Sequence, residues 1–284
     1  MKSTTLFKCL FVIFLFTCQA HFAQIKIGAK AGYSVGKIND TSDNIYTQDY
    51  TSSSGVDIGV LIEFPISDLF SLQTEFIYTE RGGKRTGLQP IPTAALEDLG
   101  SVDQLNYLLS LQGKPPVNDQ NPLYAEFINT SELNYLEIPI LGKLGWGDTW
   151  RFYVEAGPYM GFLLSSDQIT SGESTIYTDG AARDPLFVIN PLHNPADPST
   201  GPLWVPLPPQ NFDAKTDTKD ELNTWIVGFH AGAGLIRKIA EKHELFLGFR
   251  GSWGYTTIQK DEVFGESHIG GLVFSLGYAF TLCC

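Results

Sequence analysis

The sequence predicts an all-β fold: an eight-stranded antiparallel up-and-down transmembrane β-barrel with long extracellular loops. Three observations predict it. The chain begins with a short apolar run typical of an export signal, eight later segments alternate apolar and polar residues, and the links between these segments are alternately long and short. This combination is typical of proteins that cross the outer membrane of Gram-negative bacteria as strands.

Residues 1–23 have the features of a cleaved signal peptide. Two early lysines precede the apolar run Leu10–Phe16, and Ala23 is a small residue at a cleavage position. The run is shorter than the roughly 20 apolar residues that a membrane-spanning helix needs. An alternative is a lipoprotein cut before Cys18, although the threonine before this cysteine fits poorly. We therefore predict an exported barrel domain over residues 24–284.

The eight alternating segments carry the prediction of a barrel. They span residues 25–35, 56–64, 70–78, 135–146, 151–164, 224–235, 244–255 and 271–280. In 151–164 the even positions are apolar, whereas the odd positions include charged and small residues, so the two faces meet different solvents. The segments all reach the roughly 9 to 11 residues that a membrane strand needs, whereas strands of soluble sandwiches have about five or six. Their length favours a membrane barrel.

The links between the segments predict which end of the barrel faces outward. Short turns are expected at 67–69, 147–149 and 238–243, and long outer loops at about 37–54, 82–131, 165–221 and 259–267. Bacterial barrels have short periplasmic turns and longer extracellular loops. Eight strands with this alternation place both ends of the barrel domain in the periplasm.

Composition excludes several other classes of function. The net charge of −12 argues against nucleic acid as a partner, because phosphate binding needs a basic surface. After loss of the signal peptide, Cys283 and Cys284 are the only cysteines, so we expect no disulfide framework. Acidic residues at Asp213, Asp217 and Asp220 lack the spacing and glycine turn of a calcium loop, so we predict no metal and no cofactor.

Charged residues on the inward faces predict a filled lumen. The set comprises Lys26, Lys30, Asp57, Glu63, Glu75, Arg81, Glu137, Lys143, Arg151, Glu155, Glu244 and Arg250. The interior of an eight-stranded barrel is just wide enough for side chains, and opposite charges buried together should pair. We therefore interpret the set as a structural network, with His230 as a lumen histidine. The alternative is a narrow porin or channel for small solutes.

The two longest loops are the expected location of function. In 82–131, Ser101 and Gln104 resemble a capping box that opens a helix, and Gly113 follows its end. The apolar face of this helix needs a partner, for which the other long loop is the candidate. That loop, 165–221, is rich in proline, and its Trp204 is a candidate binding anchor.

No enzyme motif is present, although two groups of residues carry the side chains that catalysis would need. Ser267 with His268, and His193 with Asp197 and Ser199, contain residue types that a lipid-modifying hydrolase uses. A catalytic role requires a nucleophile within hydrogen-bond reach of a base, and the spacing does not indicate such a contact. We predict no catalytic residues. A lipid-modifying enzyme remains a third alternative.

Several blocks resemble the PorT-type outer-membrane barrel family of Bacteroidetes. They are Ile27–Tyr33 (IGAKAGY), Leu136–Leu141 (LEIPIL), Tyr153–Tyr159 (YVEAGPY), His230–Leu235 (HAGAGL) and Gly277–Phe280 (GYAF). The resemblance implies an eight-stranded outer-membrane barrel without enzymatic activity in most members, and a role in protein secretion in one branch. It makes outer-membrane lipid and other outer-membrane or periplasmic proteins the expected partners. The chain departs from the family by its two very long loops and by the cysteines at its end.

From these observations we expect a non-enzymatic outer-membrane barrel. Its extracellular loops would act in surface binding or as an assembly- or secretion-associated component.

Overall fold

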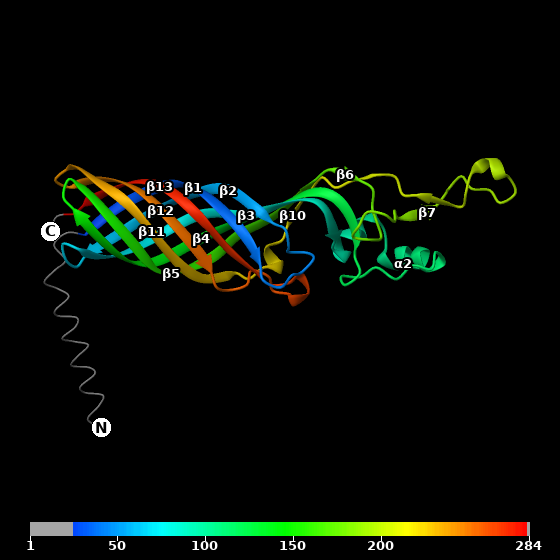
Figure 1. Ribbon diagram of the computed structural model, residues 1–284, viewed down its shortest axis with the longest axis horizontal. Coiled ribbons are helices and arrows are strands. Elements are labelled where there is room, and N and C mark those ends of the chain that lie inside the picture. The colour runs from blue at the N-terminus through cyan, green and yellow to red at the C-terminus, as the bar shows by residue number, and fades with distance from the viewer. Residues whose placement is uncertain (1–24, 283–284) are drawn as a thin grey trace, which may run out of the picture.

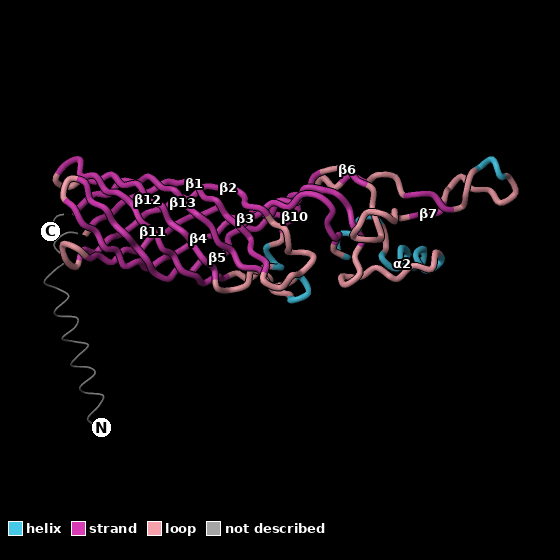
Figure 2. The backbone as a smooth tube through the Cα atoms, viewed as in Figure 1, coloured by secondary structure: helices cyan, strands magenta, loops and turns pink. Residues whose placement is uncertain are grey.

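Eight antiparallel strands close into a barrel in the computed structural model, which describes residues 25–282 (Figure 1 and Figure 2). The strands are β1 (Lys26–Asp40), β2 (Thr51–Pro65), β3 (Phe70–Ile91), β4 (Leu123–Gly147), β5 (Trp150–Ser171), β11 (Trp225–Ala240), β12 (His243–Gly254) and β13 (Ser267–Thr281). Each strand pairs with its neighbour in this order, and β13 pairs with β1 from Lys26↔Thr281 to Asp40↔Ser267. The closed ring leaves no strand edge open to lipid, as a membrane barrel requires. The predicted fold is confirmed.

The described ends of the chain lie together at the end of the barrel that carries the short turns (Figure 1). The backbone amide of Leu282 donates to the carbonyl of Ile25 at 2.8 Å. The turns at this end lie between β2 and β3, between β4 and β5, and between β11 and β12. Short turns mark the periplasmic end of bacterial barrels. The predicted signal peptide, 1–23, and the terminal cysteines lie outside the described residues, so those predictions stay open.

The outer surface of the barrel wall is apolar and ends in aromatic residues. Trp146 and Trp150 are half exposed at the short-turn end, and Trp225, Trp253 and Tyr255 are exposed at the opposite end. Such rings settle where hydrocarbon meets the headgroups. The two groups therefore mark the two boundaries of the membrane. None of the described helices combines the length and apolarity needed to span a bilayer.

Three strands continue far beyond the barrel on the side opposite the chain ends (Figure 1). β3, β4 and β5 have 22, 25 and 22 residues, longer than the predicted segments. The predicted loop bounds 37–54, 82–131, 165–221 and 259–267 are therefore wrong: the strands end such that the links span 41–50, 92–122, 172–224 and 255–266. For the loop before β4, the reason is that the apolar face of this strand changes sides along its length, which interrupts the alternation used for prediction.

The extended strands carry a folded extracellular head formed by links 92–122 and 172–224. Its helices are η1 (Thr93–Leu99), α2 (Val102–Leu111), η2 (Pro198–Thr200) and η3 (Lys219–Glu221), and its strands are β6 (Glu173–Ser174), β7 (Phe187–Ile189), β8 (Trp204–Pro206), β9 (Gln210–Asn211) and β10 (Ala214–Asp217). β10 pairs with the outer part of β5, beyond the residues that β11 covers. A further short helix, η4 (Glu262–Phe264), lies in the last outer link.

The predicted helix is present as α2, with one difference at its start. Ser101 occupies the N-cap position, but its side chain makes no capping hydrogen bond, so the predicted capping box does not form. The helix ends before Gly113, whose φ of +69° suits glycine. The buried face of α2, centred on Leu109, packs against residues of both long links.

Candidate functional site: the lumen and the extracellular head

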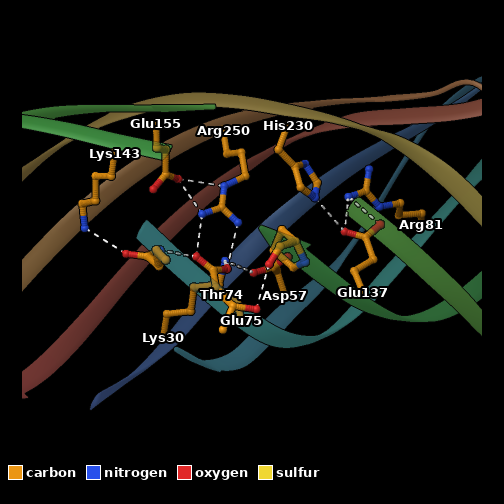
Figure 3. Close-up of polar contacts among 12 residues, drawn as sticks. Lys30, Asp57, Thr74, Glu75, Arg81, Glu137, Lys143, Glu155, His230 and Arg250 are labelled. Atoms are coloured by element: carbon orange, nitrogen blue, oxygen red, sulfur yellow. Dashed lines mark hydrogen bonds and ion pairs between the residues drawn. The ribbon is translucent and has the colours of Figure 1, made fainter. Parts of the chain in front are cut away.

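A five-residue ion network occupies the middle of the lumen (Figure 3). Arg250 of β12 donates two hydrogen bonds to the Glu75 carboxylate of β3, at 2.7 and 2.8 Å, and two more to Glu155 of β5, at 2.5 and 2.9 Å. Lys30 of β1 reaches Glu75 at 2.8 Å and Asp57 of β2 at 3.5 Å. Alternation along five strands turns these side chains inward, and each charge is offset by an opposite charge.

A second group of ion pairs lies toward the periplasmic end. Lys26 of β1 contacts Glu244 of β12 at 2.7 Å and Glu63 of β2 at 3.9 Å. Lys143 of β4 contacts Glu63 at 2.9 Å. Lys143 also donates to the Gln73 side chain at 3.0 Å, and Gln73 in turn donates to Glu75 at 2.5 Å. The two ion groups therefore form one continuous polar column.

A third group lies toward the extracellular end of the lumen. Arg81 of β3 contacts Glu137 of β4 at 3.0 Å and donates to the hydroxyl of Ser252. Nε2 of His230 lies 3.2 Å from Glu137, and its ring stacks on Tyr159 with the ring centroids 4.2 Å apart. His230 thus lies in the lumen, as predicted, between a carboxylate and an aromatic face.

An apolar layer closes the lumen beyond these charges. It consists of the buried residues Ile38, Leu133, Tyr135, Tyr159, Leu163, Ile226, Ile258 and Ile269. These residues come from the extracellular parts of the barrel strands and from the last outer link. We call this group the apolar seal. Side chains of the wall therefore fill the cross-section both at the charges and above them, as expected for a barrel of this size.

Eleven of the twelve predicted lumen residues take part in ion pairs. The exception is Arg151, which lies half-buried at the periplasmic mouth and donates to the backbone carbonyls of Asp68 and Gly145. The expectation that Arg151 joins the ion network of the lumen is therefore wrong: Arg151 lies next to the short β4–β5 turn, far along β5 from the carboxylates of that network.

Some buried polar residues could not be recognised from charge alone, and three of them make contacts of note. Gln73 joins two ion groups, Ser252 accepts from Arg81, and Arg85 lies buried further out, where it donates to the Ile45 carbonyl at 2.8 Å. Neutral polar side chains cannot be recognised from charge, but Gln73 lies on the same face of β3 as Glu75, and Ser252 on the same face of β12 as Arg250. This alternation would have identified both residues as inward-facing. Arg85 falls in a part of β3 that was predicted to be a loop.

The extracellular head has a hydrophobic core of its own. The buried members are Ile91, Leu96, Leu109, Val117, Leu123, Ala125, Phe127, Ile176 and Leu186, with Val102, Leu105, Leu207 and Phe212 packed against them. The two long links thus fold together, as the apolar face of the helix led us to expect. At the edge of this core Lys114 contacts Asp184 at 2.9 Å, and this hydrogen bond lowers the pKa of the Asp184 carboxyl.

A two-stranded arm projects from the head (Figure 1). β7 and β8 pair with each other from Phe187↔Pro206 to Ile189↔Trp204. The side chains of Ile189, Leu192 and Leu203 are exposed, Leu192 at 75%, and Trp204 is half-buried. The arm therefore presents apolar side chains to water beyond the membrane.

The serine and histidine residues weighed for catalysis do not form a dyad. Ser267 is fully buried, and His268 follows it on the opposite face of β13. In the arm, the Ser199 hydroxyl donates to Asp197, whereas the His193 ring bonds to the Gly201 carbonyl. Within residues 25–282, no group of three or more metal-binding side chains comes together.

Comparison with solved structures finds small outer-membrane barrels at low identity. Neisserial surface protein A matches at 10% identity over 91% of this chain and 97% of its own, with a TM-score of 0.38. Ail of Yersinia pestis matches at 8% over 90% and 98% (TM-score 0.36), and OprG of Pseudomonas aeruginosa at 8% over 94% and 99% (TM-score 0.39). No curated protein matches by sequence.

A protein-family model also matches this chain. The model, described as an outer membrane protein beta-barrel domain, matches residues 19–259, which is most of the chain. This range includes seven of the eight barrel strands and the whole head. The chain belongs to the outer membrane protein beta-barrel domain family and lies in the outer membrane.

Proposed function

We propose that this protein is a non-enzymatic surface-binding protein that acts through its extracellular head, and that the barrel serves as its membrane anchor. Paired charges such as Arg250 with Glu75 serve a structural role in this proposal, because they hold the walls together across the lumen. The head carries the binding function through the apolar side chains of the β7–β8 arm, with Trp204 as a candidate anchor.

One observation carries the proposal: the two long links share a hydrophobic core outside the membrane. A barrel that needed its links only to close the strands would need no such core, since bacterial barrels close with links of a few residues. Ordering 31 residues from 92 to 122 and 53 from 172 to 224 costs conformational entropy, which the core around Leu109 and Phe127 offsets. The head therefore holds the arm in a defined position.

The sequence blocks extend the proposal to the PorT-type branch of Bacteroidetes barrels. The block Leu136–Leu141 lies in the membrane part of β4 and turns Glu137 toward Arg81, whereas Tyr153–Tyr159 lies in β5 and turns Glu155 toward Arg250. Both blocks thus supply one carboxylate to the lumen. This shared use supports a common barrel design and makes an assembly- or secretion-associated partner in the outer membrane a further part of the proposal.

Site-specific photo-crosslinking in native outer membranes tests the proposed binding surface. We expect a photoreactive residue at Leu192 in the arm to yield discrete adducts, because this side chain is the most exposed large apolar one in the arm. A matched probe at Tyr107, exposed on the far side of α2, should yield none. Equal adduct patterns at both positions, or no adducts at Leu192, would contradict a binding role for the arm.

A further inference from the structure

A shallow, open groove crosses the membrane-facing wall of the barrel on β5, β11, β12, β13 and β1. It has a volume of about 610 Å³ and is lined almost entirely by apolar side chains. The small side chains of Ala233 and Ala31 form its floor. Larger side chains border it, namely those of Leu235, Leu247 and Leu276. One row of directly paired residues crosses four of these strands: Leu235, Leu247, Leu276 and Ala31. The groove therefore spans neighbouring strands within the hydrocarbon.

An exposed arginine lies at the periplasmic end of this groove. Arg237 lies two residues after the groove residue Leu235, on the same face of β11. On the neighbouring strand β5, Trp150 lies two residues before the groove residue Phe152 and pairs with Arg237. Two residues of a strand span about 7 Å. The Arg237 guanidinium lies 4.9 Å from the centroid of the Trp150 ring. Among the described residues, no carboxylate lies within ion-pair distance of Arg237.

We infer that Arg237 and the groove together form a binding site for one anionic phospholipid of the periplasmic leaflet. An acyl chain fills the groove between the leucine side chains, and the lipid phosphate contacts Arg237 at the boundary that Trp150 marks. Bulk lipid covers every part of the wall without preference. Here the groove for the acyl chain ends about two strand residues from Arg237, a cation without an ion-pair partner among the described residues. The site should therefore prefer an anionic lipid over a zwitterionic one.

Native mass spectrometry of the purified, folded protein tests this site. The protein is released from micelles that contain equal amounts of phosphatidylglycerol and phosphatidylcholine with identical chains. We expect one phosphatidylglycerol to be retained in preference. Arg237→Gln should reduce this preference about fivefold, the effect of one surface cation on an anionic headgroup. Arg237→Lys keeps the charge and should keep most of the preference.

Two control variants separate the site from general effects. Arg183→Gln makes the same change of charge in the exposed head, and Val60→Phe adds an aromatic ring to the exposed wall of β2 outside the groove. Both should leave retention unchanged, whereas Ala233→Phe should reduce it because the ring fills the groove. Glycerol phosphate should not displace the lipid, since it has no chain.

Several results would overturn the inference. The first is equal retention of the two lipids by the unmodified protein. The second is an equal effect of Arg237→Gln and Arg183→Gln. Displacement by glycerol phosphate would mean that the phosphate alone is recognised, and a lipid-free dimer lost in Ala233→Phe would assign the groove to a second copy of the chain. Migration of each variant on unheated gels verifies that it is folded.

Discussion

The lumen and the extracellular head share strands β3 and β4 but are stabilised in opposite ways. In the lumen, Arg250 and Glu75 pair across the barrel, and the outer face of the wall is apolar. In the head, Leu123 and Phe127 form an apolar interior, and the opposite face of β4 carries Glu126, which is exposed. The difference follows from the solvent: lipid surrounds the first region and water the second.

β4 shows the change within one strand. Its odd-numbered side chains point inward along the whole length, and they are charged or polar at Glu137 and Lys143 but apolar at Leu123, Ala125 and Phe127. The geometry of the strand is unchanged, since side chains alternate throughout. What changes is which face must be apolar. Alternation alone therefore predicts a strand, and the face that is apolar indicates whether lipid or water surrounds it.

The largest expected effect comes from removing the arginine that holds the lumen together. Arg250→Ala leaves Glu75 and Glu155 without their main partner in a buried position. We expect the free energy of unfolding to fall by about 3 to 5 kcal/mol, because an uncompensated buried charge is costly. Urea unfolding in lipid vesicles, followed by tryptophan fluorescence, measures the change.

Arg151→Ala is the matched control for this change in the lumen. Arg151 donates to two backbone carbonyls at the periplasmic mouth and forms no ion pair with a described residue, so its loss should cost about 1 kcal/mol. Similar losses in the two variants would mean that the ion network contributes little, and the contrast between a charged lumen and an apolar head would lose its energetic basis.

A smaller effect, confined to the head, is expected from Leu109→Ala. The leucine is buried in the head core, so its truncation should destabilise the head by about 2 to 4 kcal/mol and leave the barrel folded. Limited proteolysis of intact cells should cleave the head of this variant faster, while migration of the barrel on unheated gels stays unchanged. Leu111→Ala, at an exposed position of the same helix, should behave like the unmodified protein. Joint loss of barrel and head would show that the two regions are one cooperative unit.

Much of the barrel could be predicted because the membrane imposes a simple pattern on the sequence. The segments 135–146 and 151–164 alternate cleanly, and eleven inward charges identified from this alternation meet in the lumen. The pairing partners could not be predicted, because they depend on the stagger of neighbouring strands. Arg151 shows this: it lies on the inward face of β5, as alternation predicts, but too close to the periplasmic end of the barrel to reach the ion network.

The head was less predictable from the sequence. The helix α2 and its need for an apolar partner could be derived, but not the continuation of β3 and β4 beyond the membrane. The chain between residues 123 and 134 lacks the outward apolar face that a membrane strand requires. Its inward apolar residues pack in one core with Ile176 and Leu186 of the other link. These two residues are distant in the sequence, so the sequence pattern could not predict the contact.

The smallest expected effect concerns the ion pair at the edge of the head. Lys114 lowers the pKa of Asp184 below its ordinary value of 3.8, so the pair stabilises the head above that pH and ceases to do so as the pH falls through the lowered pKa. Because the Asp184 side chain is half exposed, the contribution should stay below about 1 kcal/mol. Proteolysis of the head by an acid-active protease between about pH 2 and 5 measures it. Asp184→Asn should remove the pH dependence that this pair contributes. If the rate of head proteolysis in Asp184→Asn depends on pH as in the unmodified protein, the pH dependence comes from other carboxyl groups.

The central claim is that the barrel is a closed anchor and that the protein acts through its head. Single-channel recording of the full chain in planar bilayers tests this claim most directly, since ions would have to pass both the charge network around Arg250 and the apolar seal around Tyr135. We predict no stable conductance above the background of protein-free bilayers at either polarity. Reproducible open steps from the folded protein would contradict the filled lumen and favour a narrow channel.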